Sequence, residues 1–404
     1  MRKVLVVGYG VSGKAAAAFL RARGDDVVVV DQKGGEGVLS DTADIPLHEF
    51  QQVIVSPGIP PTHPLVQKAQ ERGIEVIGEM ELGCRHLQNR CFGITGSNGK
   101  TTTVTLVAHL LNAAGKKARA LGNVGDSLCH YLLHADPEEI ILLELSSFQL
   151  ETLHAPVLEA ALVLNITPNH LDRHRDMQEY ASAKARIQCC VKEGGSVYVS
   201  DAVLDAYRPL FPNAQTFEKE LALIEALSYT QLEMPSKQSV QAAYLLCKRC
   251  GVTDAEFLRG LTRYKKPPHR IEWVAEINGV AYYNDSKSSN IHSVLHAVER
   301  IEGPVILLIG GVHKGASYKP WITPFQGKVR QMIAYGKAAP IMEYELAPYF
   351  PFVGVDRFAD AVKLAKQMAK KPEAVLLSPG CSSYDQFENY EQRGDEFKRL
   401  VREL

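Results

Sequence analysis

One glycine-rich segment constrains the fold more than any other part of this 404-residue chain. Residues 93–103 read Gly-Ile-Thr-Gly-Ser-Asn-Gly-Lys-Thr-Thr-Thr. A β-prone run, Cys91–Thr95, enters the segment, and a helix is expected over Thr101–Ala114. The glycines let the backbone wrap an anion, the lysine supplies charge for phosphates, and the following hydroxyl can reach Mg²⁺. The segment therefore predicts a strand, turn and helix that bind ATP or a similar nucleotide.

The spacing of this segment departs from the common phosphate-binding loop. That loop has a glycine five positions before its Gly-Lys-Ser/Thr tripeptide. Here Gly99 is followed by Lys100 and Thr101, but Ile94 stands at the earlier position. A chance Gly-Lys-Thr tripeptide is common, so the prediction depends on the longer string.

The composition argues against several classes of protein. The formal net charge is −1 and 46% of residues are hydrophobic, so we expect a folded chain without a nucleic-acid partner. No apolar run approaches the roughly 20 residues of a membrane helix, and the N-terminus does not read as a secretory signal. We therefore expect a cytoplasmic protein without a membrane partner. Cys247 and Cys250 form the only C-x-x-C, and a reduced protein is favoured over zinc or redox use.

Strand-like and helix-like segments alternate along the chain, which predicts an α/β fold with mainly parallel sheets. Boundaries near residues 89 and 267 predict three domains, 1–89, 90–267 and 268–404. The expected strands include Lys3–Val7, Val27–Val30, Val53–Val55, Cys91–Thr95, Ile140–Leu145, Ala161–Ile166, Val197–Ser200, Ala281–Asn284, Val305–Ile309, Gln331–Tyr335 and Ala374–Leu377.

The first expected strand runs into a second glycine-rich turn, Gly8-Tyr9-Gly10-Val11-Ser12-Gly13. An acid, Asp31, ends the next strand. This G-x-G-x-x-G pattern is typical of a fold that binds a pyrophosphate at a helix N-terminus, with the acid on a ribose hydroxyl. The pattern alone leaves NAD and other nucleotides open.

Polar side chains follow the central strands directly. Glu144 ends an apolar run, and His170 lies in a polar loop soon after the next strand. Ligands bind at the carboxyl ends of parallel strands, so Mg²⁺ ligation by Glu144 becomes the better reading beside the phosphate loop. Lys184, in the expected helix Met177–Gln188, looks by itself like an ordinary surface lysine.

Further strings resemble, in order, those of the Mur ligase family. They are Gly122-Asn123-Val124-Gly125, Glu144-Leu145-Ser146-Ser147-Phe148-Gln149-Leu150, His170-Leu171-Asp172-Arg173-His174, Tyr180-x-x-x-Lys184, Pro268-His269-Arg270, Asn284-Asp285-Ser286-Lys287-Ser288-Ser289-Asn290, Gly310-Gly311-x-x-Lys314-Gly315, Ser378-Pro379-Gly380-Cys381-Ser382-Ser383-Tyr384-Asp385-Gln386-Phe387 and Arg393-Gly394-Asp395-x-Phe397.

This resemblance implies an ATP-dependent amide ligase of three domains. They would be a Rossmann-like UDP-binding domain, a central P-loop-type ATPase domain and a Rossmann-like C-terminal domain. The strings favour the branch that joins D-glutamate to UDP-N-acetylmuramoyl-L-alanine through an acyl phosphate, in peptidoglycan precursor synthesis. A monomer is expected. A folylpolyglutamate synthetase remains the alternative within the superfamily, and a nicotinamide-dependent dehydrogenase the alternative outside it.

The resemblance also implies roles for individual residues. ATP would be bound by Gly96, Ser97, Asn98, Gly99, Lys100, Thr101, Thr102, Arg270 and Asp285. The UDP-sugar would be bound by Ser12, Asp31, Lys33, Ser56, Pro57, Gly58, Asn123 and His170. D-glutamate would be bound by Lys287, Lys314, Ser383 and Tyr390. The catalytic residues would be Lys100, Glu144, His170 and Lys184.

Two Mg²⁺ sites follow from the same resemblance. Thr101 and Glu144 would hold one ion, and His170 and a carbamylated Lys184 would hold the other. Carbamylation adds CO₂ to a neutral amine and turns a cation into an anion, which explains how a lysine could serve a metal site.

Overall fold

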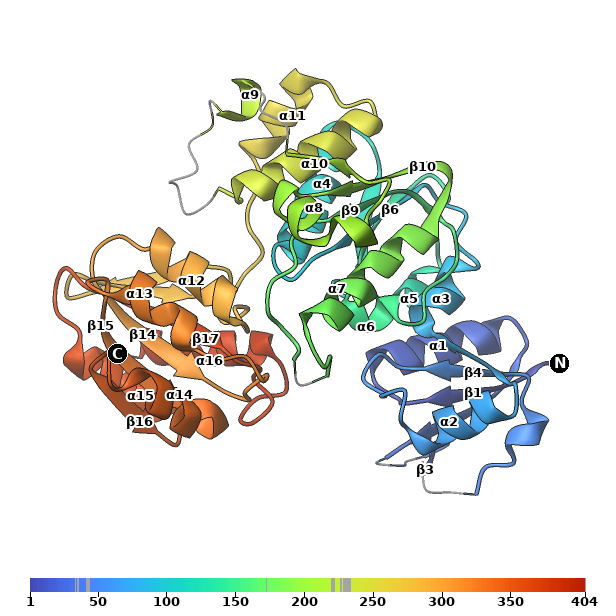
Figure 1. The fold of residues 1–404 in the computed structure, drawn as a ribbon, viewed down its shortest axis with the longest axis horizontal. Helices are drawn as coiled ribbons and strands as arrows, with labels where there is room; N and C mark the ends of the chain where they lie inside the picture. The colour runs from blue at the N-terminus through green and yellow to red at the C-terminus, as the bar shows by residue number, and fades with distance from the viewer. Residues whose placement is uncertain are drawn as a thin grey trace. The chain divides into compact units, whose positions relative to one another are not determined.

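The computed structural model describes residues 1–32, 34, 36–40, 44–171, 173–218, 222–225, 227 and 234–403. These residues form three α/β sheets, which confirms the expected fold class (Figure 1). By their contacts the residues divide into two compact units. The first unit comprises Met1–Ile166, Ala181–Ala226 and Ser236–Tyr264, and the second comprises Thr167–Tyr180, Leu227–Pro235 and Lys265–Leu404. The three-domain boundaries stay a prediction.

The first sheet is entirely parallel, in the order β3-β2-β1-β4-β5. Its strands are β1 (Lys3–Val7), β2 (Asp26–Asp31), β3 (Leu39–Ser40), β4 (Gln52–Val55) and β5 (Glu75–Gly78). Its helices are α1 (Val11–Ala22), α2 (Pro64–Glu71) and α3 (Glu79–Cys84). Buried cores lie on both faces of the sheet. The strand order reverses between β1 and β4, and a crevice at such a reversal is where open α/β sheets bind ligands.

The second sheet is also parallel, in the order β11-β10-β9-β6-β8-β7. Its strands are β6 (Cys91–Thr95), β7 (Ala118–Gly122), β8 (Ile140–Glu144), β9 (Leu158–Val163), β10 (Val191–Val199) and β11 (Gln215–Thr216). The helices around it are α4 (Lys100–Ala113), α6 (Ser147–Leu150), α7 (Met177–Ala185), α8 (Asp201–Tyr207), α9 (Ala222–Glu225), α10 (Lys237–Arg249) and α11 (Asp254–Leu261). The short helix α5 (Leu128–Tyr131) packs on α1 and α3 of the first sheet. Every residue of β6 and β8 is buried, as expected for central parallel strands.

The third sheet has the order β12-β13-β17-β14-β15-β16. Its strands are β12 (Glu272–Ile277), β13 (Val280–Asn284), β14 (Val305–Gly310), β15 (Val329–Tyr335), β16 (Phe352–Val355) and β17 (Ala374–Gly380). Its helices are α12 (Ile291–Arg300), α13 (Ile322–Phe325), α14 (Ala339–Leu346), α15 (Phe358–Met368) and α16 (Tyr390–Arg402). Edge strand β12 is antiparallel to β13, and the other pairs are parallel. Cores formed with α12–α14 and with α15–α16 cover the two faces.

Several sequence-predicted boundaries need correction. The strand expected over Val197–Ser200 is β10, which begins at Val191, and two further corrections lie near the phosphate loop. The strand expected over Ala161–Ile166 is β9, which begins at Leu158 and ends at Val163. Its continuation leaves the sheet because Asn165 O accepts a hydrogen bond from Ser97 N in the phosphate loop. The helix expected over Met177–Gln188 ends as α-helix at Ala185 and continues as a 3₁₀ turn.

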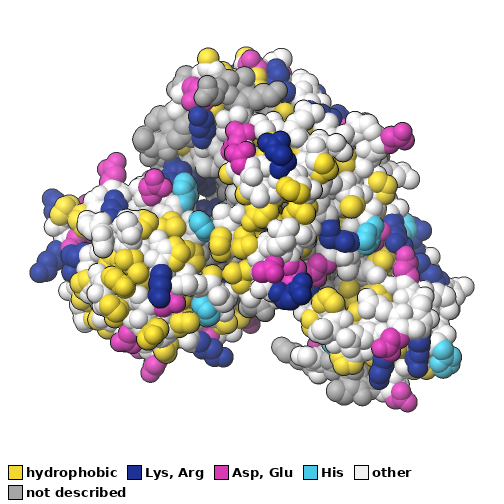
Figure 2. Space-filling view, in the orientation of Figure 1, with side chains coloured by type: hydrophobic (Ala, Val, Ile, Leu, Met, Phe, Trp, Pro, Cys, Tyr) yellow, Lys and Arg dark blue, Asp and Glu magenta, His cyan; other side chains and the backbone are white. Residues whose placement is uncertain are grey.

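Charged side chains of both signs are interspersed on the face drawn in Figure 2. Within the described part of the chain, no helix combines the length and the apolar character that crossing a bilayer requires. All eight cysteines are free, and the thiols of Cys247 and Cys250 are buried.

Candidate functional site

The phosphate loop lies between β6 and α4, at the carboxyl edge of the second sheet (Figure 1). Gly99 has φ 80° and Gly96 has φ 153°, both in the region that favours glycine. Lys100 Nζ donates to Gly96 O at 2.7 Å and to Ser97 O at 3.1 Å, so the ammonium lies within the loop. The next residue, Thr101, is buried in the first turn of α4. This geometry offers backbone N–H groups, a cation and a hydroxyl to a bound phosphate.

Asn165, which follows β9, holds the loop from the neighbouring strand. Its Oδ1 accepts from Asn98 N at 2.8 Å, and its Nδ2 donates to Asn98 O at 3.2 Å. Its backbone oxygen accepts from Ser97 N at 2.8 Å. Sequence reasoning gave Asn165 no role, although its position after a central strand was a signal that could have found it.

Glu144 is a buried carboxylate at the end of β8, next to the strand that carries the loop. Its Oε1 accepts from Asn123 Nδ2 at 2.9 Å, whereas Oε2 is buried and has no hydrogen-bond partner among the described residues. A buried carboxylate oxygen is costly unless an ion or a donor satisfies it. A divalent cation beside the phosphate loop would satisfy Oε2, so the residues present fit Mg²⁺.

Lys184, on α7, is only 1% exposed and donates from Nζ to Gly96 O at 3.0 Å. Burial holds the pKa of this amine well below its usual range, and Lys100 nearby lowers it further, while Glu144 opposes the shift. The interpretation of Lys184 as a surface lysine is therefore wrong. A buried amine with a lowered pKa has the neutral form available, and the neutral form is the one that adds CO₂.

The other expected metal ligand, His170, belongs to the second unit. It has an unusual positive φ of 57°, and its carbonyl accepts from His174 N. The described residues contain no group of three or more His, Cys, Asp and Glu side chains that could hold a metal. Of the expected Mg²⁺ ligands, only Glu144 and His170 are residues of these four types, so both Mg²⁺ sites stay a prediction.

The first sheet brings together the ends of β1, β2 and β4 around the turn after β1. A Cβ on Gly13 would lie 1.8 Å from Gly8 O, so α1 can approach the turn only with glycine there. Ser56 Oγ donates to Gly8 O at 2.9 Å, and Asp31 accepts from Tyr9 N at 2.8 Å. The other expected UDP-sugar residues of this domain, Ser12, Pro57 and Gly58, lie on α1 and just after β4, whereas Lys33 lies outside the described residues.

In the second unit, Asp285 follows β13 and is buried. It accepts from Ile271 N at 3.2 Å and from Ser378 Oγ at 2.7 Å. Burial raises the pKa of Asp285 to about 6, against hydrogen bonds and nearby Arg270, which lower it. Asp285 is thus already hydrogen-bonded within the protein, and its expected contact with ATP stays a prediction, as does that of Arg270.

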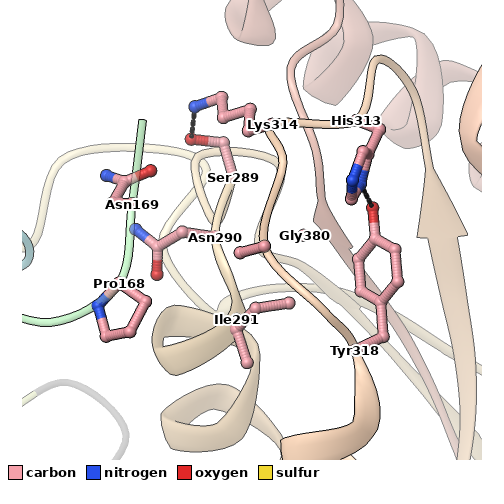
Figure 3. Close-up of a pocket in the computed structure, with 10 residues that line it drawn as sticks. Pro168, Asn169, Ser289, Asn290, Ile291, His313, Lys314, Tyr318 and Gly380 are labelled. Carbon is pink, nitrogen blue, oxygen red and sulfur yellow. Dashed lines mark hydrogen bonds between the residues drawn. The ribbon is translucent and has the colours of Figure 1, made fainter. Parts of the chain in front are cut away.

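A pocket open to solvent lies beside Lys314 in the second unit (Figure 3). Lys314 Nζ donates to Ser289 Oγ at 3.1 Å. The pocket is lined by Pro168, Asn169, Ser289, Asn290, Ile291, His313, Lys314, Ala316, Tyr318 and Gly380. Its lining thus offers an ammonium and a hydroxyl, which suit a carboxylate ligand. Ser289 and His313 were missed by sequence reasoning.

The four residues expected to bind D-glutamate do not all meet at this pocket. Of them, only Lys314 is among the described lining residues. Lys287 Nζ lies 3.7 Å from the ring centroid of Tyr390, as a cation–π pair. Ser383 is buried in the loop after β17, where its carbonyl accepts from Phe387 N.

Comparison with known proteins extends over the whole chain. The model of the Mur ligase middle domain matches residues 94–219, and that of the MurD-like N-terminal domain of Mur ligases matches residues 2–78. UDP-N-acetylmuramoylalanine--D-glutamate ligase of Protochlamydia amoebophila is 42% identical, over 100% of this chain and 98% of the relative. The chain belongs to the Mur ligase family. The enzyme of the same name from Caldanaerobacter subterraneus is 34% identical, with the same shares covered.

Solved structures support the fold. UDP-N-acetylmuramate-alanine ligase MurC of Thermotoga maritima has a TM-score of 0.62 at 15% identity and full coverage of both chains. MurF ligase of Thermotoga maritima, in complex with ADP, has a TM-score of 0.62 at 16% identity, over 100% of this chain and 96% of that one. Family membership confirms the expectation of an ATP-dependent amide ligase and argues against a nicotinamide-dependent dehydrogenase.

Proposed function

We propose that this Mur ligase joins D-glutamate to UDP-N-acetylmuramoyl-L-alanine, with ATP converted to ADP and phosphate. The observation that carries the proposal is the 42% identity, over the full chain, to the UDP-N-acetylmuramoylalanine--D-glutamate ligase of Protochlamydia amoebophila. Three features of the first unit support this chemistry. They are the phosphate loop, the buried Oε2 of Glu144, which has no hydrogen-bond partner among the described residues, and Lys184, which contacts the loop and has a lowered pKa. A bifunctional folylpolyglutamate synthase/dihydrofolate synthase of Yersinia pestis shares the fold at 15% identity, and a likeness at that identity supports the fold alone.

The reaction has two chemical steps. An alanyl carboxylate oxygen attacks the γ-phosphorus of ATP, ADP leaves, and an acyl phosphate forms. The amine of D-glutamate then attacks the acyl carbon, phosphate leaves, and the nitrogen loses its proton. The residues contribute mainly positioning and neutralisation of charge. Lys100 and the N–H groups of the loop would hold the β- and γ-phosphates.

Thr101 and Glu144 would hold Mg²⁺, which supplies positive charge to the transferring phosphoryl group. A carbamate on Lys184, with His170, would hold a second ion. Carbamylation forms an N–C bond between the neutral amine and CO₂ and releases a proton. The buried position of Lys184 and its lowered pKa support this modification.

The remaining roles follow the expected three-domain organisation. Ser12, Asp31, Ser56 and Asn123 would bind the UDP-sugar, and Arg270 and Asp285 the nucleotide. Lys314 would bind a carboxylate of D-glutamate, and the hydroxyl of Ser289 would be a further donor. We also propose that the protein acts in the cytoplasm, as a monomer, in peptidoglycan precursor synthesis.

Phosphate release from ATP tests the proposal. We expect release with UDP-N-acetylmuramoyl-L-alanine to require D-glutamate, and omission of Mg²⁺ to abolish it. A Lys100→Ala variant is the inactive control. Release that is independent of D-glutamate, or that occurs with a folate and L-glutamate instead, would contradict the assignment.

Lys184→Ala tests the carbamate. We expect activity to fall at least about a hundredfold, because charge stabilisation at the phosphoryl group is lost. Short-chain carboxylic acids should restore part of the activity by supplying the missing carboxylate. Lys192→Ala, at an exposed position of β10, is the matched control. Full activity of Lys184→Ala without added acid would remove Lys184 from the mechanism.

A further inference from the structure

A chain of hydrogen bonds forms one wall of the pocket beside Lys314 (Figure 3). His313 Nδ1 lies 2.8 Å from the hydroxyl of Tyr318. The same hydroxyl lies 3.0 Å from Cys381 Sγ. His313 and Tyr318 both line the pocket, although Tyr318 is almost fully buried, and Cys381 is buried behind them. The imidazole is therefore oriented from the protein interior through one of its two nitrogens.

The chemistry of the three groups assigns the protons. Burial raises the pKa of the Tyr318 hydroxyl and raises the pKa of the Cys381 thiol to about 11, so both are protonated near neutral pH. An imidazole nitrogen is a much better acceptor than a thiol sulfur. The hydroxyl of Tyr318 therefore donates to His313 Nδ1, and the thiol donates to the hydroxyl oxygen. Because Nδ1 accepts this hydrogen bond, the proton of the imidazole is on Nε2, which is therefore an N–H donor.

The pocket has the charge of an anion site. Its described lining contains one ammonium group, that of Lys314, and no carboxylate. Lys314 and Ser289 are paired with each other, so they can serve one carboxylate together. D-glutamate carries two carboxylates, and its second one needs a separate donor. His313 precedes Lys314 in the same loop and supplies an oriented donor on the same pocket.

We propose that His313 is a specificity-determining residue, whose Nε2–H binds the side-chain carboxylate of the acceptor amino acid, with Tyr318 as the positioning residue behind it. The inference deepens the proposed function and rests on it. His313 selects a dianionic acceptor over a neutral one, and it takes no part in phosphoryl transfer.

Steady-state kinetics of His313→Ala test the inference. We expect KM for D-glutamate to rise about ten- to a hundredfold, because a hydrogen bond to a charged group is lost. The turnover number should stay within about twofold, since the lost contact binds the ground state and the transition state alike. KM for ATP and for the UDP-sugar should not change. With D-glutamine, whose side chain is uncharged, kcat/KM should fall less than with D-glutamate.

Two further variants separate orientation from packing. Tyr318→Phe keeps the ring but frees Nδ1, and we expect a smaller rise in KM for D-glutamate. His313→Gln offers an amide N–H donor and should restore much of the affinity that His313→Ala loses. Tyr344→Phe, at an exposed tyrosine of α14, should behave as the wild type.

The outcomes distinguish this inference from the proposed function. Wild-type phosphate release that does not depend on D-glutamate would overturn both. Dependence on D-glutamate with an unchanged KM in His313→Ala would overturn the inference alone. A fall in kcat at saturating D-glutamate, with KM unchanged, would also overturn it and would make His313 a proton-transfer residue. If His313→Ala does not fold, His313→Gln and Tyr318→Phe decide by the same KM criterion.

Discussion

Asp285 is a buried carboxyl group whose ionisation opposes folding. Its folded pKa is about 6, above the usual value of 3.8, because burial disfavours the charged form. When the pKa of a carboxyl group is higher in the folded protein than in the unfolded chain, its contribution to stability is greatest at a pH below the pKa of the unfolded chain. This contribution is lost as the pH rises through the pKa of the folded protein. The difference in pKa corresponds to about 3 kcal/mol.

Asp285→Asn should therefore remove the part of the pH dependence of the unfolding free energy that Asp285 contributes. Asparagine can accept from Ile271 N and donate to Ser378 Oγ, so the local hydrogen bonds survive. We expect the difference in unfolding free energy, variant minus wild type, to increase by about 2–3 kcal/mol when the pH is raised from 4 to 8, because only the wild type loses stability as Asp285 ionises. Urea denaturation of both proteins across this range measures the difference. A constant difference would show that Asp285 ionises as easily in the folded protein as in the unfolded chain.

Lys184 and Ser289 show what residue-level prediction could not reach. The spacing of residues around Lys184 does not distinguish a buried face of α7 from an exposed one, and only the family resemblance singled it out. Ser289 stands among several polar residues after β13, and its pairing with Lys314 joins positions 25 residues apart. Such pairs depend on tertiary packing, which a local pattern does not contain.

At the scale of elements, prediction worked best where a strand is buried on both faces. The bounds of β1 and β6 are those expected from the sequence, because continuous apolar runs end at glycine-rich turns. The end of β9 was placed too late, since the backbone after Val163 bonds to the phosphate loop rather than to a neighbouring strand. The start of β10 was also placed too late, at Val197 instead of Val191, where the pairing with β9 is irregular.

Helix α3 carries two buried carboxylates that bind backbone groups next to the second sheet. Glu79 accepts from Cys129 N at 2.7 Å. Glu81 accepts from His154 N at 2.7 Å and from Ala155 N at 2.9 Å. These bonds connect the first sheet to the second within the first unit, and they satisfy amides that would otherwise be buried without acceptors.

Glu81→Ala should destabilise the first unit strongly. Two backbone amides would lose a charged acceptor, and we expect a loss of about 3–5 kcal/mol in unfolding free energy. Glu75→Ala is the matched control, because Glu75 also pairs with Arg85 but its side chain is 48% exposed. Its cost should stay within about 1 kcal/mol. Equal losses in the two variants, measured by urea denaturation, would contradict the role of the buried amides.

At the scale of the whole molecule, the residues expected to form the site are divided between the two units. The phosphate loop, Glu144 and Lys184 belong to the first unit, and the pocket beside Lys314 belongs to the second. In the proposed mechanism the first set of residues would serve phosphoryl transfer, together with His170, Arg270 and Asp285 of the second unit. The pocket beside Lys314 would serve only the binding of the amino acid. A substitution in the pocket should therefore separate the two steps of the reaction.

Lys314→Ala should block ligation and leave the acyl phosphate step intact. We expect kcat/KM for D-glutamate to fall about a hundredfold, because a charge-assisted contact is lost. Hydroxylamine can replace the amine and release phosphate from the acyl phosphate without entering an amino-acid site. Phosphate release with UDP-N-acetylmuramoyl-L-alanine and hydroxylamine should then match the wild type. Lys319→Ala, at a nearby exposed lysine, is the control. Loss of the hydroxylamine-dependent release in Lys314→Ala would show that Lys314 is needed for phosphoryl transfer as well.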